Sequence, residues 1–252
     1  MSLGGFLAIR NGELLDYCWR EAIRSMLPIC DQIVVSESES SDGTREALNA
    51  WAHQEPKITI VSYPWSNPRG DSSWWPTWIN SAREYLNTEF ACYLDADEVF
   101  HDDSYQEILD AVKQGKTLLC NRLNFWRDPR TLIPRGHCCG SEVIRVGPQR
   151  CFFPSDYPDD RAIELMRLGQ PSTVQIHHYG FLRQRDAFFR KARTVLQIWC
   201  DSYDPRLEKA EKFDGNWMTM PGINDWQDLL VPFAGTHPEV IRPWLIERGH
   251  VV

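Results

Sequence analysis

Apolar residues in the first part of the chain form short continuous runs that alternate with segments of helical spacing. FLAIR, QIVVSE, KITIVSY and FACYLD are short apolar runs typical of buried strands. Helical spacing occurs between them at Leu14, Leu15, Cys18, Trp19, Ala22 and Met26, then at Ala47, Leu48 and Trp51, and again within residues 74 to 86. The pattern therefore predicts strands and helices in strict alternation.

This alternation predicts an α/β fold with a mainly parallel sheet flanked by helices, because parallel neighbours require crossover connections. Ligands of such sheets bind outside the carboxyl ends of the strands. Residues that follow strands are therefore expected to gather at one edge. They are Ser36 and Glu37, the loop from Pro64 to Ser73, and Asp95 to Glu98.

The pattern changes beyond residue 117. TLLCNRLNFW, SEVIRV, QRCFF and TVQIHHYG are predicted strands separated by Pro and Gly turns, which indicates a mixed or antiparallel extension. Ser104 and Glu107 form a candidate capping box for a helix before this region. Helices are also predicted near the C-terminus: one capped by Asp186, with Phe189, Ala192, Leu196 and Trp199 on its apolar face, and a short one opened by Thr236 and Glu239.

Length and charge narrow the functional classes. The 252 residues suit one domain over 1–252 with a full core. A net charge of -8 argues against nonspecific nucleic-acid binding, which needs a broad basic surface. Neither a signal peptide nor a membrane-spanning run is expected, so we predict a cytoplasmic protein. The oligomeric state is left open.

The eight cysteines favour reduced, buried thiols over a disulfide framework, because residues such as Cys18, Cys92, Cys120 and Cys200 fall in predicted core elements. Cys138 and Cys139 are adjacent but lack the spacing of a zinc site. Among eleven tryptophans, Trp74, Trp75 and Trp78 crowd a polar segment. Most are expected in the core, while at least one of these three is a candidate wall of a sugar site.

YLDADE carries the main candidate chemistry. Alternate residues of a strand point to the same side, so Asp95 and Asp97 can converge just past its carboxyl end. Paired carboxylates suit Mg²⁺ or Mn²⁺, which keeps open positions for the phosphate oxygens of a nucleotide diphosphate. Acidic triplets also occur in solvated turns, and that alternative stays open at this point.

The order of these pieces resembles the GT-A (Rossmann-like) fold of nucleotide-sugar glycosyltransferases, most closely glycosyltransferase family 2. Four segments carry the resemblance: FLAIRNGELL, IVVSESESSDGTREAL, INSAREYLNTEFACYLDADE, and IHHYGFLRQRDAFFRKA with its downstream lysine. Residues 1–100 would form the nucleotide-binding half, and residues 101–252 the acceptor half with a C-terminal helical extension. SESESS departs from the family pattern, which has a glycine after the acidic residue.

The resemblance implies a metal-dependent enzyme that moves a sugar from a nucleotide-diphosphate sugar to a glycan or other hydroxyl acceptor. Glu37 stands where the family has an aspartate that contacts uracil or ribose. The implied nucleotide contacts are Arg10, Glu37, Arg69, Asn80, Asp95 and Ala96. The implied ligands of Mn²⁺ or Mg²⁺ are Asp95, Asp97 and His178, whereas His177 points to the other side of its strand.

An inverting transfer also needs a general base near the acceptor hydroxyl. No clear glutamate-aspartate pair marks it, so the candidates are acidic residues between the metal motif and the histidine: Asp156 first, then Asp159 and Glu142. Two other functions stay open. One is a non-catalytic carbohydrate- or nucleotide-binding protein with a degenerate transferase fold. The other is a sugar nucleotidyltransferase, although the glycine-rich phosphate loop of that class is replaced here by RNGE.

Overall fold

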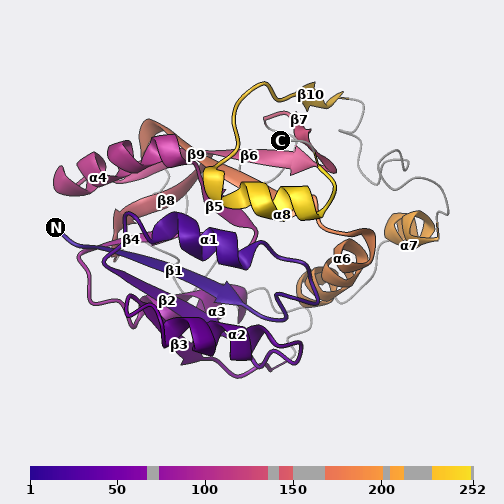
Figure 1. Cartoon of the computed structure of the whole chain (residues 1–252), viewed down its shortest axis with the longest axis horizontal. Coiled ribbons are helices and arrows are strands. Elements are labelled where there is room, and N and C mark those ends of the chain that lie inside the picture. Colours follow the sequence, from indigo (N-terminus) through magenta and orange to yellow (C-terminus); the bar gives the residue numbers. More distant parts are fainter. Residues whose placement is uncertain (67–73, 136–141, 150–167, 201–204, 213–228, 251–252) are drawn as a thin grey trace.

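The computed structural model describes residues 1–66, 74–135, 142–149, 168–200, 205–212 and 229–250. The first four strands are β1 (Leu3–Ile9), β2 (Gln32–Glu37), β3 (Ile58–Ser62) and β4 (Phe90–Tyr93). The helices between them are α1 (Trp19–Met26), α2 (Thr44–Ala52) and α3 (Trp74–Arg83). The predicted alternation of strands and helices is confirmed (Figure 1).

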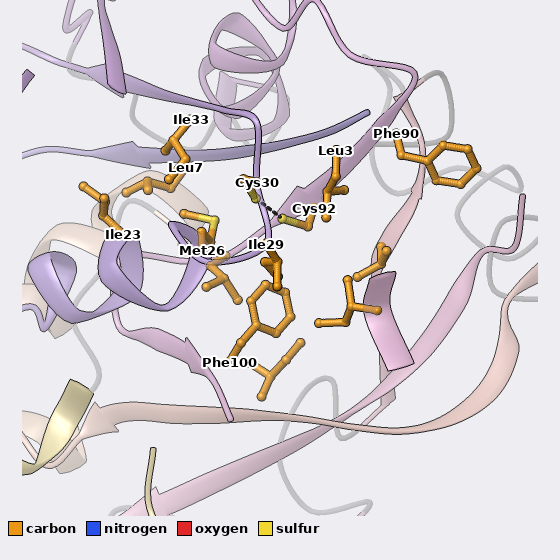
Figure 2. Close-up of a cluster of buried hydrophobic side chains, with 14 of the residues drawn as sticks. Leu3, Leu7, Ile23, Met26, Ile29, Cys30, Ile33, Phe90, Cys92 and Phe100 are labelled. Atoms are coloured by element: carbon orange, nitrogen blue, oxygen red, sulfur yellow. Dashed lines mark hydrogen bonds between the residues drawn. The ribbon is translucent and has the colours of Figure 1, made fainter. Parts of the chain in front are cut away.

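These four strands are parallel and lie in the order β3-β2-β1-β4. Alternate residues of β1 point to opposite faces: Leu7 packs with Ile23 of α1, and Phe6 packs with Ile79 of α3. Helices therefore cover both faces of the parallel sheet, as predicted. Figure 2 shows the cluster on the α1 side, in which Leu7, Ile23 and Met26 are buried together with Cys30 and Cys92.

The second half extends the same sheet. Its strands are β5 (Glu98–Phe100), β6 (Leu118–Trp126), β7 (Asp128–Leu132), β8 (Glu142–Pro148), β9 (Gln170–Phe181) and β10 (Val231–Pro232). Its helices are α4 (Tyr105–Lys113), α6 (Arg185–Cys200), α7 (Pro205–Glu211) and α8 (Arg242–Glu247), with 3-10 turns at Asp102–Ser104 and Glu239–Ile241. β8 lies antiparallel between β4 and β6, and β9 runs parallel to β6 and antiparallel to β5. The mixed extension is confirmed.

Several local predictions differ from the structure. The first helix begins at Trp19 rather than near Leu14, since Asn11 and Asp16 adopt positive φ angles of 51° and 52° that break the helical backbone. Asp186 lies in the first turn of α6 instead of capping it. The three-residue strand β5 was not predicted, because three residues show no periodicity. The predicted strand QRCFF lies largely outside the described residues.

The predicted capping box is wrong, although a helix does follow it. Ser104 Oγ accepts a hydrogen bond from the Gln175 amide at 2.9 Å, and Glu107 Oε1 accepts one from the Thr173 amide at 3.1 Å. Both side chains thus attach β9 to α4 instead of closing the helix end on itself.

The described cysteines Cys18, Cys30, Cys92 and Cys120 are free and buried, which confirms the prediction of core thiols for three of the four residues named above. The side chain of the fourth, Cys200, and the pair at 138 and 139 lie outside the description. Cys30 and Cys92 Sγ are 3.4 Å apart, in hydrogen-bonding contact (Figure 2). None of the helices in the described ranges is long and apolar enough to cross a membrane.

Candidate functional site

A cavity of about 350 Å³ opens at the carboxyl ends of β1 and β4. This is the edge at which parallel α/β sheets bind ligands. Helix α6 contributes Lys191 to the lining of this cavity. In Figure 1 this helix lies beyond the arrowhead of β1. The lining residues are Ala8, Ile9, Arg10, Tyr17, Trp75, Trp78, Ile79, Tyr93, Asp95, Ala96, Asp97, Arg122, His178 and Lys191.

The structure brings together five of the eleven site residues predicted from the sequence. Arg10, Asp95, Ala96, Asp97 and His178 all line the cavity. Glu37, Asn80 and Glu142 are described but do not line it. Arg69, Asp156 and Asp159 lie outside the described residues.

Glu37 is placed differently from its predicted role in base or ribose recognition. Its side chain is fully buried at the end of β2. Oε1 accepts a hydrogen bond from the Ser40 amide at 2.6 Å, and Oε2 pairs with the Arg45 guanidinium at 2.5 Å. Both oxygens therefore hold the turn after β2 and the start of α2. In this arrangement Glu37 shapes the loop and does not face the cavity.

Glu142, the described candidate for the acceptor base, stands at the start of β8. Its side chain is 53% exposed, and Oε1 lies 3.8 Å from Arg135 Nη1. It is not part of the cavity wall. Asn80, on α3, is buried and likewise does not line the cavity, whereas the preceding residue, Ile79, does.

Asp95 is bound by two neighbours that approach from different strands. The Tyr93 hydroxyl donates to Oδ1, and Arg145 Nη2 donates to Oδ2 at 3.0 Å. Burial and the adjacent Asp95 carboxylate raise the pKa of Tyr93 well above its ordinary value, so this hydroxyl keeps its proton. Arg145 reaches Asp95 because β8 lies antiparallel beside β4.

Asp97 is almost completely buried and is surrounded by two cations and a histidine. Arg183 Nη2 and Lys191 Nζ donate to Oδ2 at 2.5 and 2.7 Å, and His178 Nε2 lies 3.6 Å from Oδ1. Burial alone would raise the pKa of Asp97, but Lys191, His178 and Arg183 hold it well below its usual value. The carboxylate is therefore ionised at neutral pH.

Glu98, the last residue of the motif, starts β5 and is fully buried. Its Oε1 pairs with Arg122 Nε at 2.7 Å and with Arg145 Nη2 at 3.0 Å, and its Oε2 accepts from the Asp95 amide at 2.9 Å. Although burial opposes ionisation, Arg145 and Arg122 keep the pKa of Glu98 below its usual value. Glu98 fixes the turn that presents the two aspartates.

His178, which the family resemblance implied as a site residue, reaches the cavity from β9. Its Nδ1 lies 2.9 Å from Asn124 Oδ1 on the neighbouring strand β6. Burial and the nearby Arg122 lower the pKa of His178, so the imidazole is neutral at pH 7. His177 points to the opposite face, where it packs against His101 and Phe125.

Aromatic side chains also line the cavity. Trp75 and Trp78 come from α3, and Tyr17 comes from the loop after β1. A smaller cavity of about 30 Å³ continues from the first and adds Trp65, whose ring lies 4.2 Å from the Arg10 guanidinium carbon. The predicted involvement of a tryptophan from this segment in a ligand site is thus supported by the placement of Trp75 and Trp78.

Sequence reasoning missed most of the basic residues of the site. Those missed are Arg122, Arg145 and Arg183, whereas Lys191 was noted only as the downstream lysine of the fourth family-like segment. A signal existed for Arg145, since an arginine inside the apolar strand SEVIRV must find an acidic partner when it is buried. Arg183 gave no such signal because it follows its strand in a polar segment.

The residues around the motif do not fit the metal site predicted from Asp95, Asp97 and His178. A divalent cation needs carboxylate oxygens that are open to it. Both Asp95 oxygens already accept hydrogen bonds, and Oδ2 of Asp97 is bound by two cations. Only Oδ1 of Asp97 and Nε2 of His178 remain as a facing pair. Among the described residues, no group of three or more His, Cys, Asp or Glu side chains is suited to a metal.

Comparison with protein families identifies the class of this protein. The model of glycosyl transferase family 2 matches residues 10–189. This match spans more than half of the chain and includes the cavity-lining residues from Arg10 to His178. The chain therefore belongs to glycosyl transferase family 2 and is a glycosyltransferase. A search of curated proteins finds no match.

Solved structures show more distant similarity. S. aureus TarS 1-349 is 12% identical, with 84% of this chain and 70% of that chain covered and a TM-score of 0.47. Its complex with UDP-GlcNAc gives 13% identity, coverage of 83% and 70%, and a TM-score of 0.47. A Bacillus anthracis structure described as a putative glucose-1-phosphate thymidylyltransferase, in complex with sucrose, is 8% identical. The match covers 82% of this chain and 99% of that chain, with a TM-score of 0.47. These weak similarities add no functional argument.

Proposed function

We propose that this protein transfers a sugar from a nucleotide-diphosphate sugar to a hydroxyl group of a glycan or another acceptor. The observation that carries the proposal is the composition of the cavity, in a chain that belongs to glycosyl transferase family 2. Its lining combines aromatic side chains with three cations, Arg10, Arg122 and Lys191. Aromatic faces pack on bases and sugar rings, and cations bind phosphate oxygens.

Sugar transfer requires the site to stabilise the leaving diphosphate. The bond between the anomeric carbon and the diphosphate oxygen breaks, and its electron pair stays on the leaving diphosphate. The acceptor oxygen forms the new bond, and its proton passes to a base. Negative charge therefore grows on the diphosphate, and fixed positive groups stabilise it there.

The general base stays a prediction. Asp156 and Asp159 are retained as its candidates, while the exposure of Glu142 and its pairing with Arg135 make Glu142 the weaker choice. Among the nucleotide contacts, we retain Arg10, Asp95 and Ala96, which line the cavity, and leave Arg69 as a prediction. Free buried thiols favour a reducing compartment, in keeping with the predicted cytoplasmic location.

The test is a panel of nucleotide-diphosphate sugars with mixed glycan acceptors, read out by release of free nucleoside diphosphate and by thermal shift. We expect one donor class to raise the melting temperature and to be consumed. Trp75→Leu should weaken binding of that donor about 10-fold, the scale of one lost aromatic contact. Trp51→Leu is the matched control, because Trp51 packs on Trp19 away from the cavity.

Two outcomes contradict the proposal. Pyrophosphate release from a nucleoside triphosphate and a sugar phosphate would instead indicate a nucleotidyltransferase. Binding of a nucleotide sugar with neither transfer nor slow hydrolysis, across the acceptor panel, would favour the non-catalytic alternative.

A further inference from the structure

Arg183 is a permanent partner of the buried Asp97 carboxylate. Its side chain is only 1% exposed. Nε donates to the Gly180 carbonyl and Nη1 to the Leu15 carbonyl, each at 2.6 Å, while Nη2 donates to Asp97 Oδ2 at 2.5 Å. If this guanidinium left, the Gly180 and Leu15 carbonyl oxygens would lose their hydrogen-bond donor while still buried. Asp97 therefore keeps one positive partner whatever binds in the cavity.

Lys191 is the second cation on the same oxygen, and it differs from Arg183 in being accessible. Its side chain is 25% exposed, and it lines both the main and the smaller cavity. Its ammonium group lies 2.7 Å from Asp97 Oδ2 and 5.1 Å from the Tyr17 ring centre. The Lys191 ammonium group can therefore contact an anion in the cavity while it stays paired with Asp97.

The basic side chains around the acidic motif outnumber its carboxylates. Asp95, Asp97 and Glu98 are paired with four basic side chains: Arg122, Arg145, Arg183 and Lys191. Four positive groups against three negative ones leave the cluster with one net positive charge. The neutral imidazole of His178 does not change this balance. A divalent cation next to Asp97 would be repelled by Arg183 and Lys191, whereas an anionic diphosphate is attracted to the cluster.

We propose that Lys191, assisted by Arg122, neutralises the diphosphate of the donor in the place that a divalent cation was expected to take, so that the protein binds its donor without metal. This rests on the proposed function. Arg122 qualifies because it lines the cavity with 14% of its side chain exposed while its Nε stays on Glu98. Asp97 then serves as the anchor that holds Lys191 at the cavity wall.

The experiment measures binding to the full chain after dialysis against EDTA, by calorimetry, with and without added MnCl₂. The probes are UDP, GDP, ADP and CDP, and inorganic pyrophosphate, which reports on the diphosphate site without a base. We expect one nucleoside diphosphate and pyrophosphate to bind in EDTA, with dissociation constants that change by less than about 3-fold when Mn²⁺ is added. Lys191→Met should weaken both by about 10-fold or more in EDTA, and Lys191→Arg should recover most of the affinity.

The matched control is Lys113→Met, since Lys113 also pairs with an aspartate, Asp110 at 3.3 Å, but lies exposed on α4. It should bind as the wild type does, and melting curves establish that each variant is folded. Binding that strengthens by more than about 10-fold with Mn²⁺ overturns the inference while leaving the proposed function standing. Wild-type affinity in a folded Lys191→Met variant overturns it as well. If no nucleoside diphosphate binds in either condition, both the inference and the proposed function fail.

Discussion

Arg183 Nη2 and Asp97 Oδ2 form an ion pair of 2.5 Å between two side chains that are 1% and 5% exposed. The two residues are 86 positions apart in the sequence. Asp97 follows β4, and Arg183 follows β9, whose His178 is paired with Glu98 of β5. The short strand β5 therefore brings the two charges together. This pair fixes the carboxylate at the centre of the site.

Removing the guanidinium should destabilise the protein strongly. We expect Arg183→Met to lower the free energy of unfolding by about 3 kcal/mol, because the buried carboxylate loses its firmest partner and two carbonyls lose their donors. Urea denaturation measures this change. Arg130→Met is the control: Arg130 is 70% exposed and pairs with Asp128 at 3.4 Å, so its loss should stay within about 1 kcal/mol. Equal effects of the two substitutions would refute a special role for the buried pair.

Gly180 provides the space in which His178 and Asp97 meet. A Cβ atom at this position would lie 2.4 Å from His178 Nε2 and 2.8 Å from Asp97 Oδ2. We expect Gly180→Ala to displace both groups and to lower the transfer rate by about 10-fold or more, with a stability loss of about 1–3 kcal/mol. Steady-state kinetics with the donor that the panel identifies measures the rate.

Gly147→Ala on β8 is the control, because a Cβ there first meets the Thr117 side chain at 3.1 Å, away from the cavity. It should leave the transfer rate unchanged. A Gly180→Ala variant with the wild-type rate would show that the positions of His178 and Asp97 tolerate movement.

Buried histidines should make stability fall with acid. Burial lowers the pKa of His237 to about 4, and burial with His237 and His101 nearby lowers that of His177 well below its usual value. Each folded-state pKa lies below the unfolded value of about 6.5, so the unfolded chain binds more protons as the pH drops. This stability is fully present above pH 6.5 and decreases below it, by about 2 kcal/mol for His237 at pH 5.

Urea denaturation at pH 7 and at pH 5 tests this coupling. His237→Gln should remove its share of the loss, while His53→Gln, an exposed residue at the end of α2, should not alter the loss at all. The ion pairs of Asp97 and Glu98 stabilise the protein at both pH 7 and pH 5, and this contribution is lost only at lower pH, because carboxylates of the unfolded chain titrate near pH 4. An unchanged pH dependence in the His237→Gln variant would contradict the assignment.

The Tyr93 hydroxyl should stabilise the protein through Asp95. A double-mutant cycle of Tyr93→Phe and Asp95→Asn, measured by urea denaturation, should give a coupling energy of about 1–2 kcal/mol, as expected for a hydrogen bond to an ionised group. The distant pair Tyr93→Phe and Asp128→Asn should couple by less than about 0.5 kcal/mol. Comparable coupling in both cycles would mean that the contact between Tyr93 and Asp95 contributes nothing specific.

Periodicity predicted the parallel half of the fold well. β2 matches the predicted run QIVVSE over Gln32–Glu37, since a buried strand leaves a continuous apolar run. The start of the first helix could not be predicted, because Leu14 has helical spacing but is 42% exposed in a turn. Strand β5 was missed for a related reason: its three residues gain their conformation from pairing with β9.

The site residues likewise divide into those that local sequence could locate and those whose orientation depends on tertiary contacts. Asp95 and Asp97 were found because strand ends and strand alternation are local properties, whereas His178 was found through the family resemblance. Glu37 was also found at a strand end, yet its oxygens turn toward Arg45 and Ser40. Which way a side chain turns at a strand end depends on its neighbours in space, and these come from other parts of the chain.

By itself, the sequence determined the alternation of strands and helices, the edge of the sheet that holds the site, and the acidic residues that stand there. These follow from hydrophobic periodicity and from the direction of parallel strands, which are local properties of the chain. Only the tertiary structure decided the charge of that site. Arg122, Arg145, Arg183 and Lys191 come from β6, β8, the end of β9 and α6, and they meet the acidic motif only when the sheet is assembled. Because electrostatic interaction depends on distance in space, the carboxylates that suggested a metal site in the sequence are neutralised in the folded protein.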